Sequence, residues 1–305
     1  MKKVIQYLET HQPRFIAELC QYLRFPSVSA QPQHQPDLLA CAEWIRRHCQ
    51  EVIGLEARLC PTRGNPVVMA RTPRTTPKPH YFVYGHYDVQ PGQPDDAWNP
   101  PGSAFEPRIT NNQVYGRGSS DNKGQHFAHL KALEAYLQTG TELPCDITVL
   151  LEGEEETGGR SLAEWVAAHR TELACEAVII SDTGMAGPQL PALTCRLRGL
   201  VAVELTIHGP NRDLHSGGYG GCIDNPALVL CQMLARLRDG AGRITIPGFY
   251  DDVLPLTDED QAQLREIERL PGNGLRDLEN DLGVPGLFGE QGYTATEQRT
   301  ADRQG

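Results

Sequence analysis

Short apolar runs alternate with segments of helical spacing through the first part of the chain. Apolar residues recur at helical spacing in residues 4–22, 37–49, 122–137 and 161–170. Strand-length apolar runs lie at residues 55–60, 66–70, 81–84, 147–151 and 177–180. Such alternation is typical of an α/β fold, and we expect a mixed, mostly parallel sheet flanked by helices.

The pattern changes near Arg196. Residues 200–207 alternate apolar and polar side chains, which predicts a strand with one solvated face. A helix is expected over residues 226–237, with Asn225 as its cap, and the stretch after Gly240 is acidic and irregular. Domains commonly contain about 150 residues, so a chain of 305 suggests two. We expect the domains to be residues 1–196 and residues 197–305.

The composition excludes several classes of partner. Twenty-eight basic and 39 acidic residues give a formal net charge of −11, which argues against binding to nucleic acid or an anionic membrane. No apolar run approaches the roughly 20 residues of a membrane span, and we read no signal peptide. The nine cysteines are scattered and form no CxxC pair, which is typical of a reducing compartment. We therefore expect a cytoplasmic location.

Three of the apolar strands end in acidic or imidazole side chains. His86 and Asp88 follow one strand, the acidic segment 152–156 follows another, and Asp182 follows a third. Because ligands bind at the carboxyl ends of strands in open α/β sheets, these side chains should converge on one crevice. Several carboxylates in one crevice repel one another, and two divalent cations would remove that conflict. Carboxylate and imidazole ligands suit zinc or manganese.

The spacing of residues at the first two strand ends indicates how they could act. His86 and Asp88 are two apart on an extended segment, so His86 can bind metal while Asp88 orients its ring. Taken alone, this pair is also compatible with an ordinary surface or core histidine. Among Glu154, Glu155 and Glu156, one carboxylate could bind metal and a neighbour could take a proton. The alternative is a solvated acidic loop.

Two glycine-rich segments and the third strand end carry further candidates. Asp121, in the segment 116–124, directly precedes a predicted helix, where it is either a helix cap or a carboxylate that bridges two metals. Asp182 alone is no more than an aspartate at a strand end. His215 lies in the segment 213–221, whose small residues indicate close approach to a ligand or to another chain.

Five segments together resemble a family of two-metal peptidases. The segments are GHYDVQP, YGRGSSDNKG, EGEEETGG, ISDTG and DLHSGGYGG, at residues 85–91, 115–124, 152–159, 180–184 and 213–221. The family includes aminoacylases, succinyl-diaminopimelate desuccinylase, glutamate carboxypeptidases and the cytosolic nonspecific dipeptidases, such as carnosine dipeptidases. The segments occur in the family's order, and the last one most resembles the dipeptidase branch.

The resemblance implies a set of metal ligands. His86, Asp121 and Asp182 would hold one divalent ion, and Asp121 would bridge to a second ion held by Glu156. Zinc is the expected metal, with manganese as the alternative. The resemblance also implies a cis peptide bond after Asp121.

The resemblance further implies a reaction and an assembly. The chain would hydrolyse the amide bond of dipeptides or short peptides, with Glu155 as general base and Asp88 supporting His86. The second domain would be an inserted α+β lid and dimerisation domain. From it, His215 would reach across the interface of a homodimer and polarise the substrate carbonyl.

The chain departs from the family pattern in its length. Family members continue for roughly half as much chain again, and that part carries a further histidine ligand for the Glu156 site. No histidine follows His215 here. We therefore expect both domains to be incomplete at the C-terminus, through a frameshift, a premature stop or fragmentation. Two alternative functions stay open: an amidohydrolase of the same family that acts on N-acyl amino acids, and a catalytically incompetent remnant.

Overall fold

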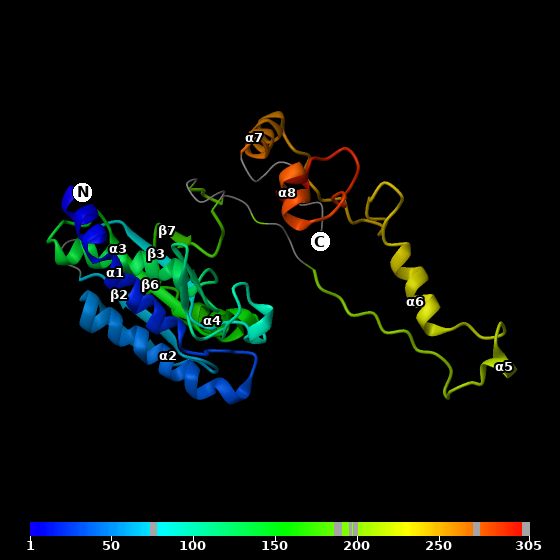
Figure 1. Cartoon of the computed structure of the whole chain (residues 1–305), viewed down its shortest axis with the longest axis horizontal. Helices are drawn as coiled ribbons and strands as arrows, with labels where there is room; N and C mark the ends of the chain where they lie inside the picture. Colours follow the sequence, from blue (N-terminus) through cyan, green and yellow to red (C-terminus); the bar gives the residue numbers. More distant parts are fainter. Residues whose placement is uncertain (74–77, 186–190, 195–196, 198–200, 271–274, 301–305) are drawn as a thin grey trace. The chain divides into compact units, whose positions relative to one another are not determined.

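The computed structural model describes residues 1–73, 78–185, 191–194, 197, 201–270 and 275–300. The chain divides into two compact units, Met1–Gly184 and Met185–Gly305 (Figure 1). The expected domain boundary after residue 196 falls among residues 195–196 and 198–200, which lie outside the described residues, so this division stays a prediction. Among the described residues, no helix combines the length and the apolar character that crossing a bilayer requires.

The first unit is built on a mixed sheet whose described strands follow the order β1-β2-β6-β3-β7. The strands are β1 (Glu56–Cys60), β2 (Val67–Arg71), β3 (His80–His86), β6 (Asp146–Glu152) and β7 (Ala177–Ile180). β3 is parallel to both β6 and β7, whereas β2 is antiparallel to β1 and β6. The α/β fold expected from the sequence is therefore confirmed. Because β6, β3 and β7 are parallel neighbours, their carboxyl ends lie at one edge of the sheet.

Helices cover both faces of this sheet (Figure 1). The helices are α1 (Lys2–Leu23), α2 (Gln35–Arg47), α3 (Lys123–Gln138) and α4 (Arg160–Ala168). Val68 and Ala70 of β2 belong to the core beneath α1, α2 and α3, whereas Val67 and Met69 belong to the core that contains Trp165 of α4. Successive side chains of a strand point to opposite faces, so β2 is apolar on both sides and buried on both.

Short elements form the connections of the first unit. They are η1 (Pro32–His34), η2 (His48–Ile53), η3 (Asp95–Ala97), β4 (Arg108–Thr110), β5 (Gln113–Tyr115) and η4 (Glu155–Thr157). The second helix begins two residues before residue 37, where its helical spacing was expected to start. α2 begins at Gln35, with Pro36 in its first turn, because the fixed φ of proline suits the start of a helix. Asp37 lies inside that turn, where its carboxylate is 2.8 Å from His34 Nδ1.

The regular elements described in the second unit are short helices, joined by long irregular segments. Its helices are α5 (Ser216–Tyr219), α6 (Pro226–Ala235), α7 (Asp258–Glu268), α8 (Leu275–Leu282) and α9 (Ala295–Thr300). The start of α6 is confirmed, since the Asn225 side chain accepts a hydrogen bond from the backbone N–H of Ala227 at 2.9 Å.

Two expectations for the second unit were wrong. No strand runs through residues 201–207, and Val203 is 77% exposed. Alternating side chains favour a strand only where a neighbouring strand accepts its hydrogen bonds. The acidic stretch after Gly240 is not irregular throughout, because α7 begins there with a capping box between Thr257 and Asp260. Acidic residues in the first turn suit the positive end of the helix dipole.

Candidate metal centre

His86 is the last residue of β3 and lies among carboxylates at the edge where β6 and β7 also end. The residue is completely buried. Its Nε2 lies 3.2 Å from Asp121 Oδ1 and 3.3 Å from Asp182 Oδ2. One donor atom from each of these residues lies within 4.8 Å of the others, which is close enough for one ion. The structure thus brings together a strand end, the loop before α3 and the segment after β7.

The two glutamates expected beside this group lie at the same edge. Glu155 and Glu156 are in η4, which follows β6 directly. Their donor atoms and one of His86 lie within 4.8 Å of one another. Glu155 Oε2 is 4.0 Å from His86 Nε2, and Glu156 accepts a hydrogen bond from Gln90 at 2.7 Å. His86 therefore belongs to both groups of possible ligands.

Asp88 lies behind His86 and is completely buried. His86 Nδ1 is 3.0 Å from the Asp88 carbonyl oxygen and 3.3 Å from its Oδ1, so Nδ1 donates its proton here. The Asp88 carboxylate accepts hydrogen bonds from the backbone N–H groups of Glu155 at 3.3 Å and Glu156 at 3.1 Å. It also accepts one from the Ser29 hydroxyl at 2.6 Å. Asp88 therefore orients the imidazole and also holds the turn that carries both glutamates.

Burial and the neighbouring carboxylates together set the proton affinities at this edge. Burial lowers the pKa of His86, but Asp88, Asp182 and Glu155 outweigh it and raise that pKa to about 9. The pKa of Glu155 is raised, first by burial and then by Glu156, Asp182 and Asp88, although His86 opposes this. The carboxylates thus stabilise positive charge at this edge. A bound divalent cation would supply that charge in place of a proton. The oxygen and nitrogen donors present fit zinc or manganese.

His215 lies in the second unit, whereas the other six predicted site residues lie in the first. It precedes α5, and its Nδ1 accepts a hydrogen bond from the backbone N–H of Gly217 at 3.0 Å. In the neutral ring, Nε2 then carries the proton and is available as a donor. The side chain lines an open hollow of about 800 Å³ within this unit.

Sequence reasoning missed several residues that support the centre. Ser29 lies in a polar, proline-containing loop, where a single serine gives no signal. Gln90 belongs to the GHYDVQP segment, but nothing in the sequence indicates its contact with Glu156. Asn122 is buried beside Asp121, and the peptide bond between them is cis, as the resemblance implied.

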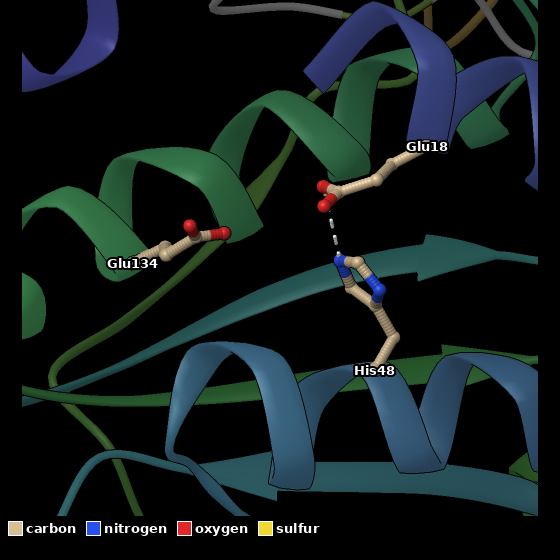
Figure 2. A group of neighbouring side chains, drawn as sticks. All are labelled: Glu18, His48 and Glu134. Carbon is tan, nitrogen blue, oxygen red and sulfur yellow. Dashed lines mark ion pairs between the residues drawn. The ribbon is translucent and has the colours of Figure 1, made fainter. Parts of the chain in front are cut away.

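Another group of possible donors, Glu18, His48 and Glu134, lies between α1, η2 and α3 (Figure 2). The Lys131 ammonium group fills the position that a cation would take. Its Nζ lies 2.6 Å from His48 Nε2, 2.6 Å from Glu18 Oε2 and 2.8 Å from Glu134 Oε2. Arg14 forms an ion pair with Glu134 as well. We call these five residues the buried charged cluster, and its internal cation argues against a metal site there.

Comparison with known proteins identifies the family. Residues 82–273 match the model of peptidase family M20/M25/M40. The chain is 35% identical over 282 residues to the Cys-Gly metallodipeptidase DUG1 of Candida albicans, covering 88% of this chain and 58% of that protein. It is 30% identical over 283 residues to the Beta-Ala-His dipeptidase of Rattus norvegicus, covering 88% of this chain and 57% of that protein. The crystal structure of human carnosine dipeptidase 1 matches with a TM-score of 0.71 and 27% identity, over 94% of this chain and 62% of that one.

The chain thus spans less than two thirds of the length of these relatives. The family match extends over most of the chain and includes all seven predicted site residues. Both relatives are named as dipeptidases, which agrees with the dipeptidase branch that the sequence segments indicated. The chain therefore belongs to peptidase family M20/M25/M40.

Proposed function

We propose that this chain hydrolyses the amide bond of dipeptides or short peptides in a metal-dependent reaction. The observation that carries the proposal is the direction of His86 Nε2, which faces both Asp121 and Asp182 while Glu155 lies 4.0 Å away. Relatives named as dipeptidases support this class of substrate.

We assign His86, Asp121 and Asp182 to one divalent cation, and Asp121 with Glu156 to a second. Zinc is the metal we propose, because imidazole and carboxylate are common zinc ligands, with manganese as the alternative. Cations bound there would polarise the substrate carbonyl and make a neighbouring water molecule more acidic.

Glu155 would act as the general base. It would take a proton from the attacking water and return that proton to the leaving amine, and its raised pKa makes it a stronger base toward the water. Asp88 would keep Glu155 in place through the hydrogen bond to its backbone N–H.

His215 would donate from Nε2 to the carbonyl oxygen of a substrate bound by a second copy of the chain, in a homodimer formed through the second unit. The hydrogen bond that Gly217 donates to its Nδ1 supports this role, because it keeps the proton on Nε2. The proposed location is the cytoplasm, and it is supported by the described cysteines, none of which forms a disulfide.

The experiment is dipeptide hydrolysis by the purified chain with added zinc or manganese, with Glu155→Gln as the control. Glutamine keeps the size of the side chain but cannot take the proton, so we expect the rate to fall by about 10²- to 10⁴-fold. N-acetyl and N-succinyl amino acids, assayed in parallel, test the amidohydrolase alternative. A folded chain that binds metal but cleaves neither class of substrate would contradict the proposal and favour the incompetent remnant.

A further inference from the structure

A buried series of hydrogen bonds runs from α1 to the end of β3. The side-chain oxygen of Asn122 accepts a hydrogen bond from the backbone N–H of His86 at 3.1 Å and lies 3.1 Å from His126 Nδ1. An oxygen can only accept, so His126 Nδ1 carries a proton and donates it. In the neutral ring, His126 Nε2 then accepts from the Tyr22 hydroxyl, 3.1 Å away. All four residues are at most 1% exposed, so water does not compete for these bonds.

Gly85 shows how closely α3 approaches β3 at this point. A Cβ atom at Gly85 would lie 2.5 Å from Asn122 Oδ1 and 2.9 Å from His126 Nδ1. Both distances are shorter than any ordinary contact, so only glycine allows the asparagine to reach the backbone of the next residue, His86. β3 and α3 are therefore closely packed beside His86, the proposed metal ligand.

A second histidine of α3 makes a similar contact beside β7. His129 follows His126 by one helical turn, and its Nε2 lies 2.6 Å from Ser181 Oγ. Ser181 directly precedes Asp182. Burial lowers the pKa of both histidines, which favours their neutral forms. Neutral rings add no positive charge beside the carboxylates that the proposed cation needs.

We propose that His126 and His129 are positioning residues for the metal centre. His126 positions His86 through Asn122, which accepts a hydrogen bond from the His86 backbone. His129 positions Asp182 through the hydroxyl of Ser181, the preceding residue. One rigid helix would thereby fix the ends of two strands relative to each other, which a site of defined geometry requires. This inference rests on the proposed metal site. Residues that support metal ligands from behind commonly affect metal affinity by about 10- to 100-fold.

The test uses a leucine variant and an amide variant at each histidine in the full chain. His126→Leu removes the donor to Asn122, whereas His126→Asn places an amide nitrogen near the position of Nδ1. His129→Leu removes the contact to Ser181, whereas His129→Gln places an amide near the position of Nε2. We expect the leucine variants to bind Zn²⁺ about 10- to 100-fold more weakly and to change the visible spectrum of the Co²⁺-loaded chain. The amide variants should recover most of the affinity and the spectrum.

His86→Ala separates failure of the inference from failure of the metal site. If His86→Ala binds Zn²⁺ like the wild type, the metal site itself is wrong. If His86→Ala loses binding but both leucine variants keep wild-type affinity and spectrum, the positioning role is overturned. Equal losses in the leucine and amide variants would also overturn it, because packing alone would then explain them.

Two milder variants cover the case in which a leucine variant does not fold, as judged by circular dichroism. Tyr22→Phe removes the hydroxyl that contacts His126. Ser181→Ala removes the hydroxyl that contacts His129. We expect each to weaken Zn²⁺ binding severalfold in a folded chain. Wild-type affinity and an unchanged Co²⁺ spectrum in both variants would overturn the positioning role.

Discussion

Asp88 connects the imidazole of the proposed metal centre to the turn that carries its glutamates. In Asp88→Asn, one carboxylate oxygen becomes an NH₂ group, which would face a backbone N–H of Glu155 or Glu156 or the Ser29 hydroxyl. We expect Zn²⁺ affinity to fall by about 10- to 100-fold, and the free energy of unfolding to fall by about 1–3 kcal/mol because a buried donor loses its acceptor. Zinc titration and urea unfolding measure the two effects.

Ser29→Ala is the matched control for this substitution. It removes one donor to Asp88 and leaves both hydrogen bonds from the backbone of η4 in place. Its effect on Zn²⁺ affinity should therefore be smaller than that of Asp88→Asn. An Asp88→Asn variant that binds Zn²⁺ as tightly as the wild type would show that the proposed centre does not depend on this carboxylate.

The sequence predicted the candidate ligands better than the residues that support them. His86 and Asp182 follow apolar strands, and parallel strands bring their ends together, so proximity could be inferred without knowing any contact. Ser29 and His126 gain their roles only when the loop after α1 and the buried face of α3 pack against β3. Such contacts join residues far apart in sequence and leave no local pattern.

At the scale of the helices, the buried charged cluster joins α1, η2 and α3. Lys131→Met keeps an apolar stem of similar length but removes the ammonium group between Glu18 and Glu134. Both carboxylates are largely buried, so we expect the free energy of unfolding to fall by about 3–5 kcal/mol at pH 7. Urea unfolding measures this loss, and Lys131→Arg, which keeps the charge, should lose less. If Lys131→Met is as stable as the wild type, the cluster does not depend on its internal cation.

The same cluster makes stability depend on pH through His48. Burial, and then the Lys131 ammonium group, lower the pKa of His48 from 6.5 to about 4, although Glu18 and Glu134 oppose this and Arg14 adds to it. Between these two values the unfolded chain binds more protons than the folded chain, so stability falls as the pH is lowered. The full effect is about 3 kcal/mol, present above pH 6.5 and lost by pH 4.

His48→Gln isolates this contribution. Glutamine places an amide oxygen near Nε2 to accept from Lys131, but it does not titrate. Urea unfolding of the wild type and the variant from pH 7 to pH 4 should show the wild type losing about 3 kcal/mol more, because the other groups titrate in both chains. Parallel losses in the two chains would contradict the low pKa of His48.

Secondary structure was predictable where a single segment carries its own signal. Residues 177–180 form the predicted strand, and α6 begins at Pro226 as expected, since Asn225 supplies the cap. The strand expected at residues 200–207 is absent over its described part, 201–207, because an alternating pattern specifies a face but not a partner strand. α7 was missed because its first turn is entirely acidic, and its capping box is the signal that could have found it.

At the scale of the whole molecule, metal should stabilise the unit that contains the proposed ligands. All of these ligands lie in Met1–Gly184, and so do the three tryptophans of the chain, Trp44, Trp98 and Trp165. Tryptophan fluorescence during urea unfolding therefore reports on this unit alone. Zn²⁺ at about 100 times its dissociation constant should add up to about 2.7 kcal/mol to the free energy of unfolding.

Asp182→Asn and a chelator test whether the stabilisation by Zn²⁺ comes from the proposed centre. Chelation should return the urea midpoint of the wild type to its metal-free value, because only binding to the folded state raises it. Asp182→Asn replaces a carboxylate 3.3 Å from His86 Nε2 with a neutral amide, so the midpoint of this variant should respond much less to Zn²⁺. A midpoint that rises equally in both chains would place the stabilising ion elsewhere in the first unit. A wild-type midpoint that does not move at saturating Zn²⁺ would mean that the folded unit binds the metal no better than the unfolded chain does, which contradicts a preformed centre.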